Sequence, residues 1–367
     1  MPQVKEIEIL IIGGGPAGLS AAAAAADLGA SVLVLERDDK PGGQLVKQTH
    51  KFFGSKKQYA GDRGYQIGNL LIEQCKNNPK VEVWTETTVL GIYEDGVVTA
   101  EGQGKHLKIN PKKIIVATGA SEKMITFPNN DLPGIYGAGA VQTLMNVHGI
   151  VPGQRVLMIG AGNIGLIVSY QLLQAGVEVA AIIEAAPTIG GYLVHASKIR
   201  RAGVPILTSH TITEAYGKES VEGAIIYKLD EKWQPIQGTE QELKVDVICL
   251  AVGLSPLTEL CFQADCQMKY VPELSGHVPI RNKYLETTRS GLYVAGDVSG
   301  VEEASSAMVE GRLAGVCAAF SLGYGTDLAP KLQAEALAEL SELRAGPAGQ
   351  KTVKGIKKLM DKGGEAC

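Results

Sequence analysis

Two glycine-rich fingerprints of the G-x-G-x-x-G type occur in this chain of 367 residues, the first over residues 13–18 and the second over residues 160–165. Each follows an apolar run that predicts a β-strand, over residues 9–12 and 156–159. Each also precedes an apolar stretch that predicts a helix. This strand–turn–helix pattern, present twice, predicts an α/β fold with two Rossmann-like dinucleotide-binding domains.

The glycines of such a fingerprint have separate physical tasks. The first permits the tight turn from strand to helix, the second lets the main chain approach a pyrophosphate, and the third lets helix and strand pack closely. A pyrophosphate would then lie at the positive end of the helix dipole. The positions concerned are Gly13, Gly15, Pro16, Ala17 and Gly18 in the first copy and Gly160, Gly162, Asn163, Ile164 and Gly165 in the second.

An acidic residue ends the next predicted strand in both copies. Glu36 lies 18 residues after Gly18 (36 − 18), and Glu184 lies 19 residues after Gly165 (184 − 165). Both spacings fit a carboxylate that binds a ribose diol, which is expected about 20 residues after the fingerprint. Such a carboxylate repels a 2′-phosphate, and no run of arginines follows either acid. The second site is therefore expected to prefer NAD to NADP.

Later strand ends also place small and acidic residues where a ligand would bind. The apolar run 114–119 and the run 247–253 resemble each other, which indicates an internal duplication. A third run, 291–297, ends in Gly296-Asp297 and precedes a helix expected from about Glu302 to Ala319. Ligands of open α/β sheets gather beyond the carboxyl ends of the strands, so Asp297 is a candidate acceptor for a polyol chain. The alternative is that Asp297 only caps the helix.

Composition narrows the function classes. The net charge of −4 gives no electrostatic basis for nucleic-acid binding, and no apolar run reaches the roughly 18 residues that span a bilayer. Glu6 and Glu8 precede the first apolar stretch, which argues against a signal peptide and favours a cytoplasmic protein. The six cysteines form no C-x-x-C motif. Cys261 and Cys266 are five residues apart, which suits neither a redox dithiol nor a zinc site, and no metal site is expected. Cys367 is terminal and expected to be mobile.

Taken together, these motifs resemble the two-dinucleotide-domain flavoprotein family that includes thioredoxin reductase, over nearly the whole chain to about residue 325. The resemblance implies FAD in a discontinuous first domain (residues 1–123 and 280–327) and a nicotinamide nucleotide in an inserted second domain (residues 124–279). A C-terminal helix and lysine-rich tail would fill residues 328–367. The chain departs from thioredoxin reductase in lacking the redox C-x-x-C.

The same resemblance implies which residues contact each cofactor. Besides the fingerprints and their acids, it assigns to FAD the residues Arg37, Gly43, Gln44, Val89, Thr118, Gly119, Gly296, Asp297, Ser305 and Ser306. It assigns Gly253, with Glu184 and the second fingerprint, to NAD or ATP. No protein side chain is expected to carry the chemistry, because hydride transfer belongs to the cofactors.

The stretch 117–142 more closely resembles the FAD/NAD-binding α subunits of multi-subunit amine and imino-acid dehydrogenases. These include dye-linked proline dehydrogenase, opine oxidase, hydrogen cyanide synthase and heterotetrameric sarcosine oxidase. The resemblance implies hydride exchange between NAD(H) and FAD and electron transfer to or from a flavoprotein β subunit. Many members carry a [2Fe-2S] domain as a cysteine-rich C-terminal extension. This chain offers only Cys367 there, so a cluster would need a separate small iron–sulfur subunit. Some members hold ATP in the second domain.

Other interpretations remain open at this point. A self-contained NADH-dependent flavin reductase or oxidase is one alternative, and an assembly subunit with a structural ATP is another. In the tail, Leu332, Ala336, Leu340 and Leu343 recur at helical spacing, which predicts a helix packed on its own domain or docked on a partner. Gly346-Pro347 is expected to end that helix, and the lysines of residues 351–362 predict a solvated or partner-facing tail.

Overall fold

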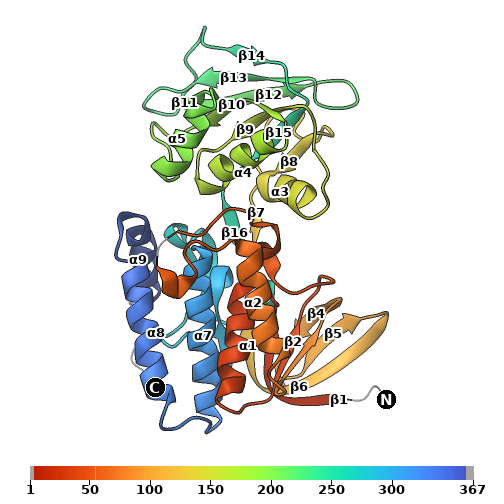
Figure 1. The fold of residues 1–367 in the computed structure, drawn as a ribbon, viewed down its shortest axis with the longest axis vertical. Coiled ribbons are helices and arrows are strands. Elements are labelled where there is room, and N and C mark those ends of the chain that lie inside the picture. Colours follow the sequence, from red (N-terminus) through yellow and green to blue (C-terminus); the bar gives the residue numbers. More distant parts are fainter. Residues whose placement is uncertain (1–3, 54, 361–367) are drawn as a thin grey trace. The chain divides into compact units, whose positions relative to one another are not determined.

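The chain folds into two compact units in a computed structural model that describes residues 4–53 and 55–360 (Figure 1). Unit 1 contains Met1–Val46, Lys51–Ser121 and Ser255–Cys367, and unit 2 contains Lys47–His50 and Glu122–Leu254. The chain therefore returns from unit 2 to unit 1 at residues 254–255, about 25 residues before the predicted boundary at 279–280. The physical reason is that Cys261, Ala264 and Cys266 are buried in the same core as Leu10 and Val116 of unit 1.

The sheet of unit 1 is parallel at its centre. Its order is β3-β2-β1-β6-β5-β4, and β19 pairs with β6. Ile12 lies opposite Leu35 and Val116, and Val116 lies opposite Val294, so four strands end at one edge of the sheet. The strands are β1 (Val4–Ile12), β2 (Val32–Leu35), β3 (Val81–Trp84), β4 (Thr87–Ile92), β5 (Val98–Gly102), β6 (Lys105–Val116) and β19 (Leu292–Val294).

Helices cover this sheet, and two of them are in close contact. A Cβ on Gly311 of α7 would lie 2.0 Å from the carbonyl oxygen of Ala17, and a Cβ on Gly315 would lie 2.3 Å from that of Ala21. Glycine at these positions thus lets α7 pack directly on α1 (Figure 1). The helices of unit 1 are α1 (Pro16–Asp27), α2 (Gly64–Lys76), α6 (Glu259–Gln263), α7 (Ala304–Ser321), α8 (Ala329–Leu343) and α9 (Pro347–Met360).

The C-terminal segment differs from its prediction. The expected helix is present as α8 and ends before Gly346-Pro347, but Pro347 starts a further helix, α9, where the prediction was a solvated or partner-facing tail. Ile356 and Leu359 of α9 pack on the core around the hairpin of β17 (Met268–Val271) and β18 (Gly276–Pro279). Lys354 and Lys358 both pair with Glu273. Lys362 and Cys367 lie outside the described residues.

Unit 2 repeats the architecture of unit 1 around a five-stranded parallel sheet of order β11-β10-β9-β15-β8. Ile159 lies opposite Ile183 and Leu250, and Leu250 lies opposite Gly137, so four strands again end at one edge. The elements are β8 (Ile135–Gly137), α3 (Ala138–Asn146), β9 (Arg155–Ile159), α4 (Asn163–Gln174), β10 (Glu178–Glu184), α5 (Leu193–Arg201), β11 (Ile206–Thr208) and β15 (Val247–Leu250).

The remaining strands of unit 2 form a small antiparallel sheet of β12 (His210–Tyr216), β13 (Gly223–Lys228) and β14 (Gln241–Leu243). The chain passes between the units through β7 (Ala120–Glu122) and β16 (Leu254–Pro256), which pair with each other. Over residues 4–53 and 55–360, none of the helices has the length and apolarity needed to cross a lipid bilayer. The same residues contain no group of three or more His, Cys, Asp or Glu side chains that could hold a metal ion.

Candidate nucleotide-binding sites

The first fingerprint forms the turn from β1 into α1. Gly13 has a φ of +105°, and a Cβ there would lie 2.4 Å from the carbonyl oxygen of Ala117. A Cβ on Gly18 would lie 1.9 Å from the carbonyl oxygen of Gly13. Gly15 is the N-cap of α1 and Pro16 opens its first turn. The fingerprint therefore presents a helix N-terminus at the sheet edge, which suits a pyrophosphate.

Glu36 lies beside this turn and is buried. One carboxylate oxygen accepts a hydrogen bond from the N–H of Gly14 at 2.8 Å, and the other accepts one from the N–H of Asp38 at 2.9 Å. Each carboxylate oxygen has two lone-pair positions, so both retain capacity for a ribose hydroxyl. The N–H of Thr87 also donates to the main-chain oxygen of Glu36, which brings β4 to the acid.

The loop at Gly42-Gly43 approaches the same turn. The N–H of Gly42 donates to the carbonyl oxygen of Gly14 at 2.8 Å. A Cβ on Gly43 would lie 2.8 Å from the Cα of Gly15, so only glycine permits this approach of two backbones. This contact supports the prediction that the loop belongs to the first nucleotide site.

Gly296 and Asp297 reach the same edge from far along the chain. Gly296 has a φ of +76°, and a Cβ there would lie 2.9 Å from the Cβ of Ala17. The carboxylate of Asp297 accepts a hydrogen bond from the N–H of Glu302 at 3.2 Å. Burial, with the nearby charges of Glu310 and Glu302, raises the pKa of Asp297 to about 7. The N-cap of α7 is Glu303, so the alternative that Asp297 caps this helix is wrong.

The second fingerprint makes nearly the same close contacts and hydrogen bonds as the first. A Cβ on Gly160 would lie 2.3 Å from the carbonyl oxygen of Ala251, and a Cβ on Gly165 would lie 2.1 Å from that of Gly160. Glu184 accepts hydrogen bonds from the N–H groups of Ala161 at 2.8 Å and Ala186 at 3.0 Å. Gly253 follows β15 with a φ of +114°. The sheet edge of unit 2 is thus a second dinucleotide-type site.

A further loop at this second site was missed by the sequence analysis. The N–H of Gly191 donates to the carbonyl oxygen of Ala161 at 2.9 Å, and the N–H of Tyr192 donates to Asn163 Oδ1 at 2.8 Å. A Cβ on Gly191 would lie 2.9 Å from the carbonyl carbon of Gly162. The signal was present, because a Gly-Gly pair stands six and seven residues after both acids, Glu36 and Glu184.

The sequence analysis also missed a third repeated segment, and the two sites differ in its sequence. Residues 134–141 read GIYGAGAV and residues 291–298 read GLYVAGDV, and their strands take the same position in the two sheets. Ala140 therefore stands where unit 1 has Asp297. The carboxylate of Glu122 accepts hydrogen bonds from the N–H groups of Gly139 at 2.6 Å and Ala140 at 3.1 Å, at the start of α3.

The remaining residues that were predicted to contact a cofactor differ in their exposure and contacts. Arg37 and Gln44 are exposed, and Ile164 is exposed on the first turn of α4. Val89 packs against the core of unit 1, and the Thr118 hydroxyl donates to the carbonyl oxygen of Leu257 at 2.7 Å, next to Gly119. Ser305 and Ser306 lie in the first turn of α7, where the hydroxyl of Ser306 bonds to Glu302.

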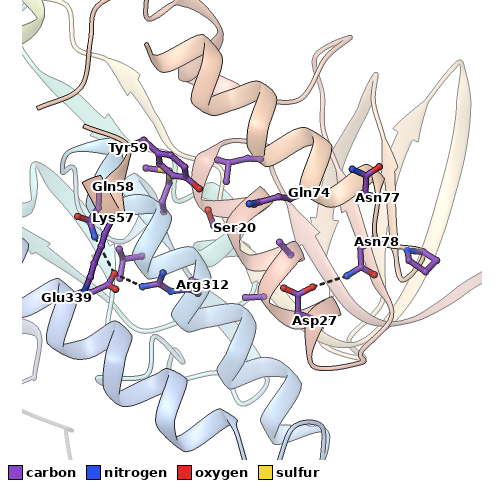
Figure 2. Close-up of a pocket in the computed structure, with 16 residues that line it drawn as sticks. Ser20, Asp27, Lys57, Gln58, Tyr59, Gln74, Asn77, Asn78, Arg312 and Glu339 are labelled. Atoms are coloured by element: carbon purple, nitrogen blue, oxygen red, sulfur yellow. Dashed lines mark hydrogen bonds and ion pairs between the residues drawn. The ribbon is translucent and has the colours of Figure 1, made fainter. Parts of the chain in front are cut away.

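An open groove of about 560 Å³ lies elsewhere in unit 1, between α1, α2, α7 and α8. None of the fingerprint residues lines it. Figure 2 shows that several of its polar side chains face one another: Arg312 and Gln58 both donate to Glu339, and Asn78 donates to Asp27. The Arg312 pair joins α7 to α8, and the other two pairs join α8 and α1 to the segments just before and after α2, so we assign the groove no ligand.

Comparisons with known proteins agree with this architecture. Residues 7–311 match the family model of the pyridine nucleotide-disulphide oxidoreductases. One of the subunits of opine oxidase from Agrobacterium tumefaciens (strain Ach5) is 30% identical over 332 residues, which cover 85% of this chain and 65% of that protein. The chain thus spans less than two thirds of this relative. Two crystal structures share the fold. That of L-proline dehydrogenase from P. horikoshii has a TM-score of 0.69 and 23% identity, and the match covers 92% of this chain and 60% of that one. That of T. acidophilum thioredoxin reductase has a TM-score of 0.72 and 22% identity, and the match covers 87% of this chain and 99% of that one.

The chain therefore belongs to the pyridine nucleotide-disulphide oxidoreductase family. The predicted resemblance and the predicted α/β fold with Rossmann-like domains are confirmed. The residues of unit 1 fit FAD: a Cβ on Gly15 would meet no atom closer than 3.9 Å, so the N-terminus of α1 is open to a pyrophosphate, Glu36 has spare acceptor positions, and Asp297 lies at the same edge.

Proposed function

We propose that the chain is an electron-transfer subunit that exchanges a hydride between NAD(H) and FAD and passes electrons to or from a partner, within an amine or imino-acid dehydrogenase complex. The observation that carries the proposal is the pair of near-identical nucleotide sites in a chain without a C-x-x-C dithiol. The similarity to one of the opine oxidase subunits supports the class of substrate and the existence of partner subunits.

In unit 1, the chain's own residues bind and orient the flavin nucleotide. The N-terminus of α1 receives the pyrophosphate, Glu36 accepts hydrogen bonds from the adenosine ribose, and Asp297 accepts them from the ribityl chain. FAD bound there would supply two-electron and one-electron chemistry, which lets it connect a hydride donor with a one-electron acceptor. The protein's contribution to the reaction is alignment of the reacting atoms.

In unit 2, we propose NAD(H) as the ligand ahead of ATP. Glu184 occupies the position of a ribose-binding acid, and its negative charge disfavours a 2′-phosphate. Ala140 replaces the polyol-binding aspartate, and Glu122 places a carboxylate at the start of α3. Both features argue against a second flavin at this edge. ATP remains the alternative ligand, because it shares the adenosine and phosphate groups that the fingerprint recognises.

The proposed partners are a flavoprotein β subunit, which would oxidise the amine, and a small subunit that would hold a [2Fe-2S] cluster. The cysteines of the described residues are buried, at Cys75, Cys249, Cys261, Cys266 and Cys317. Within residues 4–53 and 55–360 they form no group of three or more metal-ligating side chains, so they do not offer the four thiolates that a cluster needs.

The test uses the purified full-length chain. We expect a flavin absorption spectrum, one FAD released per chain on denaturation, and NADH-dependent bleaching of that flavin in the absence of oxygen. A preparation without a flavin spectrum would overturn the FAD assignment. ATP as the only nucleotide released beside FAD would overturn the NAD(H) assignment.

A second measurement addresses the complex. The tagged chain should co-purify from its native host with a second flavoprotein, and amine-dependent dye reduction should require both proteins. Rapid turnover of NADH with oxygen or dyes by the isolated chain, without any partner, would instead favour the stand-alone reductase.

A further inference from the structure

A buried ionic cluster lies directly behind the Gly296-Asp297 turn. The carboxylate of Glu310, on α7, accepts four hydrogen bonds. One oxygen accepts from the N–H of Gly296 at 3.0 Å and the hydroxyl of Ser299 at 2.9 Å. The other accepts from Arg281 at 3.0 Å and Arg344 at 2.7 Å. The side chain of Glu310 is only 3% exposed, so its charge depends on these partners.

Arg344 extends this cluster to the loop that follows Asp297. It is the C-cap residue of α8, and its guanidinium also binds Glu302 through Nε at 3.0 Å and Nη2 at 2.6 Å. The main-chain N–H of Glu302 donates in turn to the carboxylate of Asp297. Arg344 therefore contacts Glu302, which lies within the Gly296–Glu303 loop, and Glu310, which accepts a hydrogen bond from the first residue of that loop. It lies beyond residue 311, where the family match ends.

The charges of the cluster balance only with Arg344 in place. Two arginines, Arg281 and Arg344, face two glutamates, Glu302 and Glu310, and Asp297 adds a fifth titratable group. These come from the residues after β18, the end of α8, the loop, α7 and the turn itself. Without Arg344, two buried carboxylates would share one guanidinium, and their uncompensated charge would disfavour the ionised form of Asp297.

We propose that Arg344 is a positioning residue for the flavin: by pairing with Glu302 and Glu310 it holds the loop that carries Asp297 and keeps that carboxylate available as an acceptor. The inference rests on the proposed FAD site of unit 1. It links the C-terminal helix α8, which lies outside the fingerprint, to the affinity of the chain for its flavin.

The test measures FAD binding to full-length R344M and R344K as a function of pH, with R312M as the matched control. Arg312 also makes an ion pair between α7 and α8, with Glu339, but touches neither Glu302 nor Glu310. We expect R344M to raise the dissociation constant of FAD about tenfold at pH 7 and to move the pH midpoint of binding upward. R344K retains the charge and should restore that midpoint in part. R312M should bind FAD within about twofold of wild type.

E302Q gives a change of opposite sign. It removes one negative charge beside Asp297, so the pH midpoint of FAD binding should move downward, which a loss of packing alone would not produce. E302Q therefore still tests the proposed role of this cluster in FAD binding if R344M does not fold. Equal losses in R344M and R312M, or shifts of the same sign in R344M and E302Q, would overturn the inference. If wild type binds FAD and R344M is unchanged, this inference fails alone; if wild type binds no FAD, the proposed site fails with it.

Discussion

The two nucleotide units share their hydrogen bonds around the fingerprint and differ beyond the last strand of the edge. The N–H of Gly13 donates to Leu35 and that of Gly160 to Ile183, at 2.9 and 2.8 Å. Strand β6 and strand β15 meet the turn in the same way, since Ala117 and Ala251 crowd the two first glycines from the same side. The fingerprint alone therefore does not distinguish the two ligands.

The difference lies in the segment that completes each edge. In unit 1 this segment ends in Asp297. The carboxylate of Glu310, which pairs with Arg281 and Arg344, accepts a hydrogen bond from the N–H of Gly296. In unit 2 it ends in Ala140, and Glu122 takes the N–H of Gly139. Lys47 donates to the carbonyl oxygen of Gly139, and burial lowers the pKa of that lysine. From this comparison we propose that ligand identity depends on one strand end, and substitutions in the two units test this directly.

The largest effect is expected from Gly13→Ala. Its Cβ would overlap the carbonyl oxygen of Ala117, and its φ of +105° is unfavourable for alanine, which together cost about 3 kcal/mol or more. The variant should lose FAD and keep the nucleotide of unit 2, whereas Gly160→Ala should do the reverse. Measuring both nucleotides released on denaturation checks this.

Gly61→Ala is the matched control for that prediction. Gly61 has a φ of +100° in unit 1, but a Cβ there would meet no atom within 4 Å. It should cost only about 1 kcal/mol and leave FAD bound. Retention of FAD by Gly13→Ala would mean that FAD binding does not depend on the tight turn that Gly13 forms against Ala117.

Asp297→Ala makes unit 1 resemble unit 2 at the residue that separates them. Loss of a charge-assisted hydrogen bond to the ribityl chain should weaken FAD binding by about 2 kcal/mol, or roughly 30-fold. Nucleotide binding by unit 2 should not change. Asp297→Asn keeps one acceptor and should lose less, and it should remove the dependence of FAD affinity on pH near 7. Titration of apoprotein with FAD at pH 6 and pH 8 measures both effects, and wild-type affinity in Asp297→Ala would break the comparison.

Glu184→Gln sharpens the comparison from the side of unit 2. Removing the negative charge should reduce the preference for NADH over NADPH about tenfold, because the 2′-phosphate is no longer repelled. Glu36→Gln is the control, since the corresponding acid of unit 1 should leave that preference unchanged. Stopped-flow reduction of the flavin by each nucleotide gives the ratio. An unchanged ratio in Glu184→Gln would remove Glu184 from the ribose site.

The sequence predicted the parts of this comparison that depend on local chain geometry. A tight glycine turn with an acid about 20 residues later is a local pattern, so both fingerprints, Glu36 and Glu184 could be predicted from the sequence. Glu310 and Arg344 were not, because their contacts join α7, α8 and a distant loop and leave no fixed spacing. The helix α9 was missed because its lysines dominate the composition, although Thr352, Gly355 and Leu359 are buried at helical intervals.

The smallest effect concerns the acid stability of unit 1. Glu8 on β1 accepts hydrogen bonds from the N–H of Ser31 at 2.9 Å, the hydroxyl of Tyr324 at 2.8 Å and Lys112 at 3.2 Å. The N–H of Ser31 is the main cause that lowers the pKa of Glu8 to about 2. A carboxylate with a depressed pKa stabilises the fold above its unfolded value of about 4.5, and this contribution is lost as the pH falls from there towards 2.

Glu8→Gln should therefore lower the stability of unit 1 by about 1 kcal/mol at pH 7, and the difference from wild type should shrink below pH 4.5. Thermal unfolding followed by flavin release at pH 7, 5 and 3.5 measures it. Glu6→Gln is the control on the same strand, because Glu6 accepts hydrogen bonds from the uncharged amide of Asn110 and should show a smaller difference. Unfolding of unit 2 should respond to neither variant. A difference that is constant over all three pH values would show that Glu8 acts through packing rather than charge.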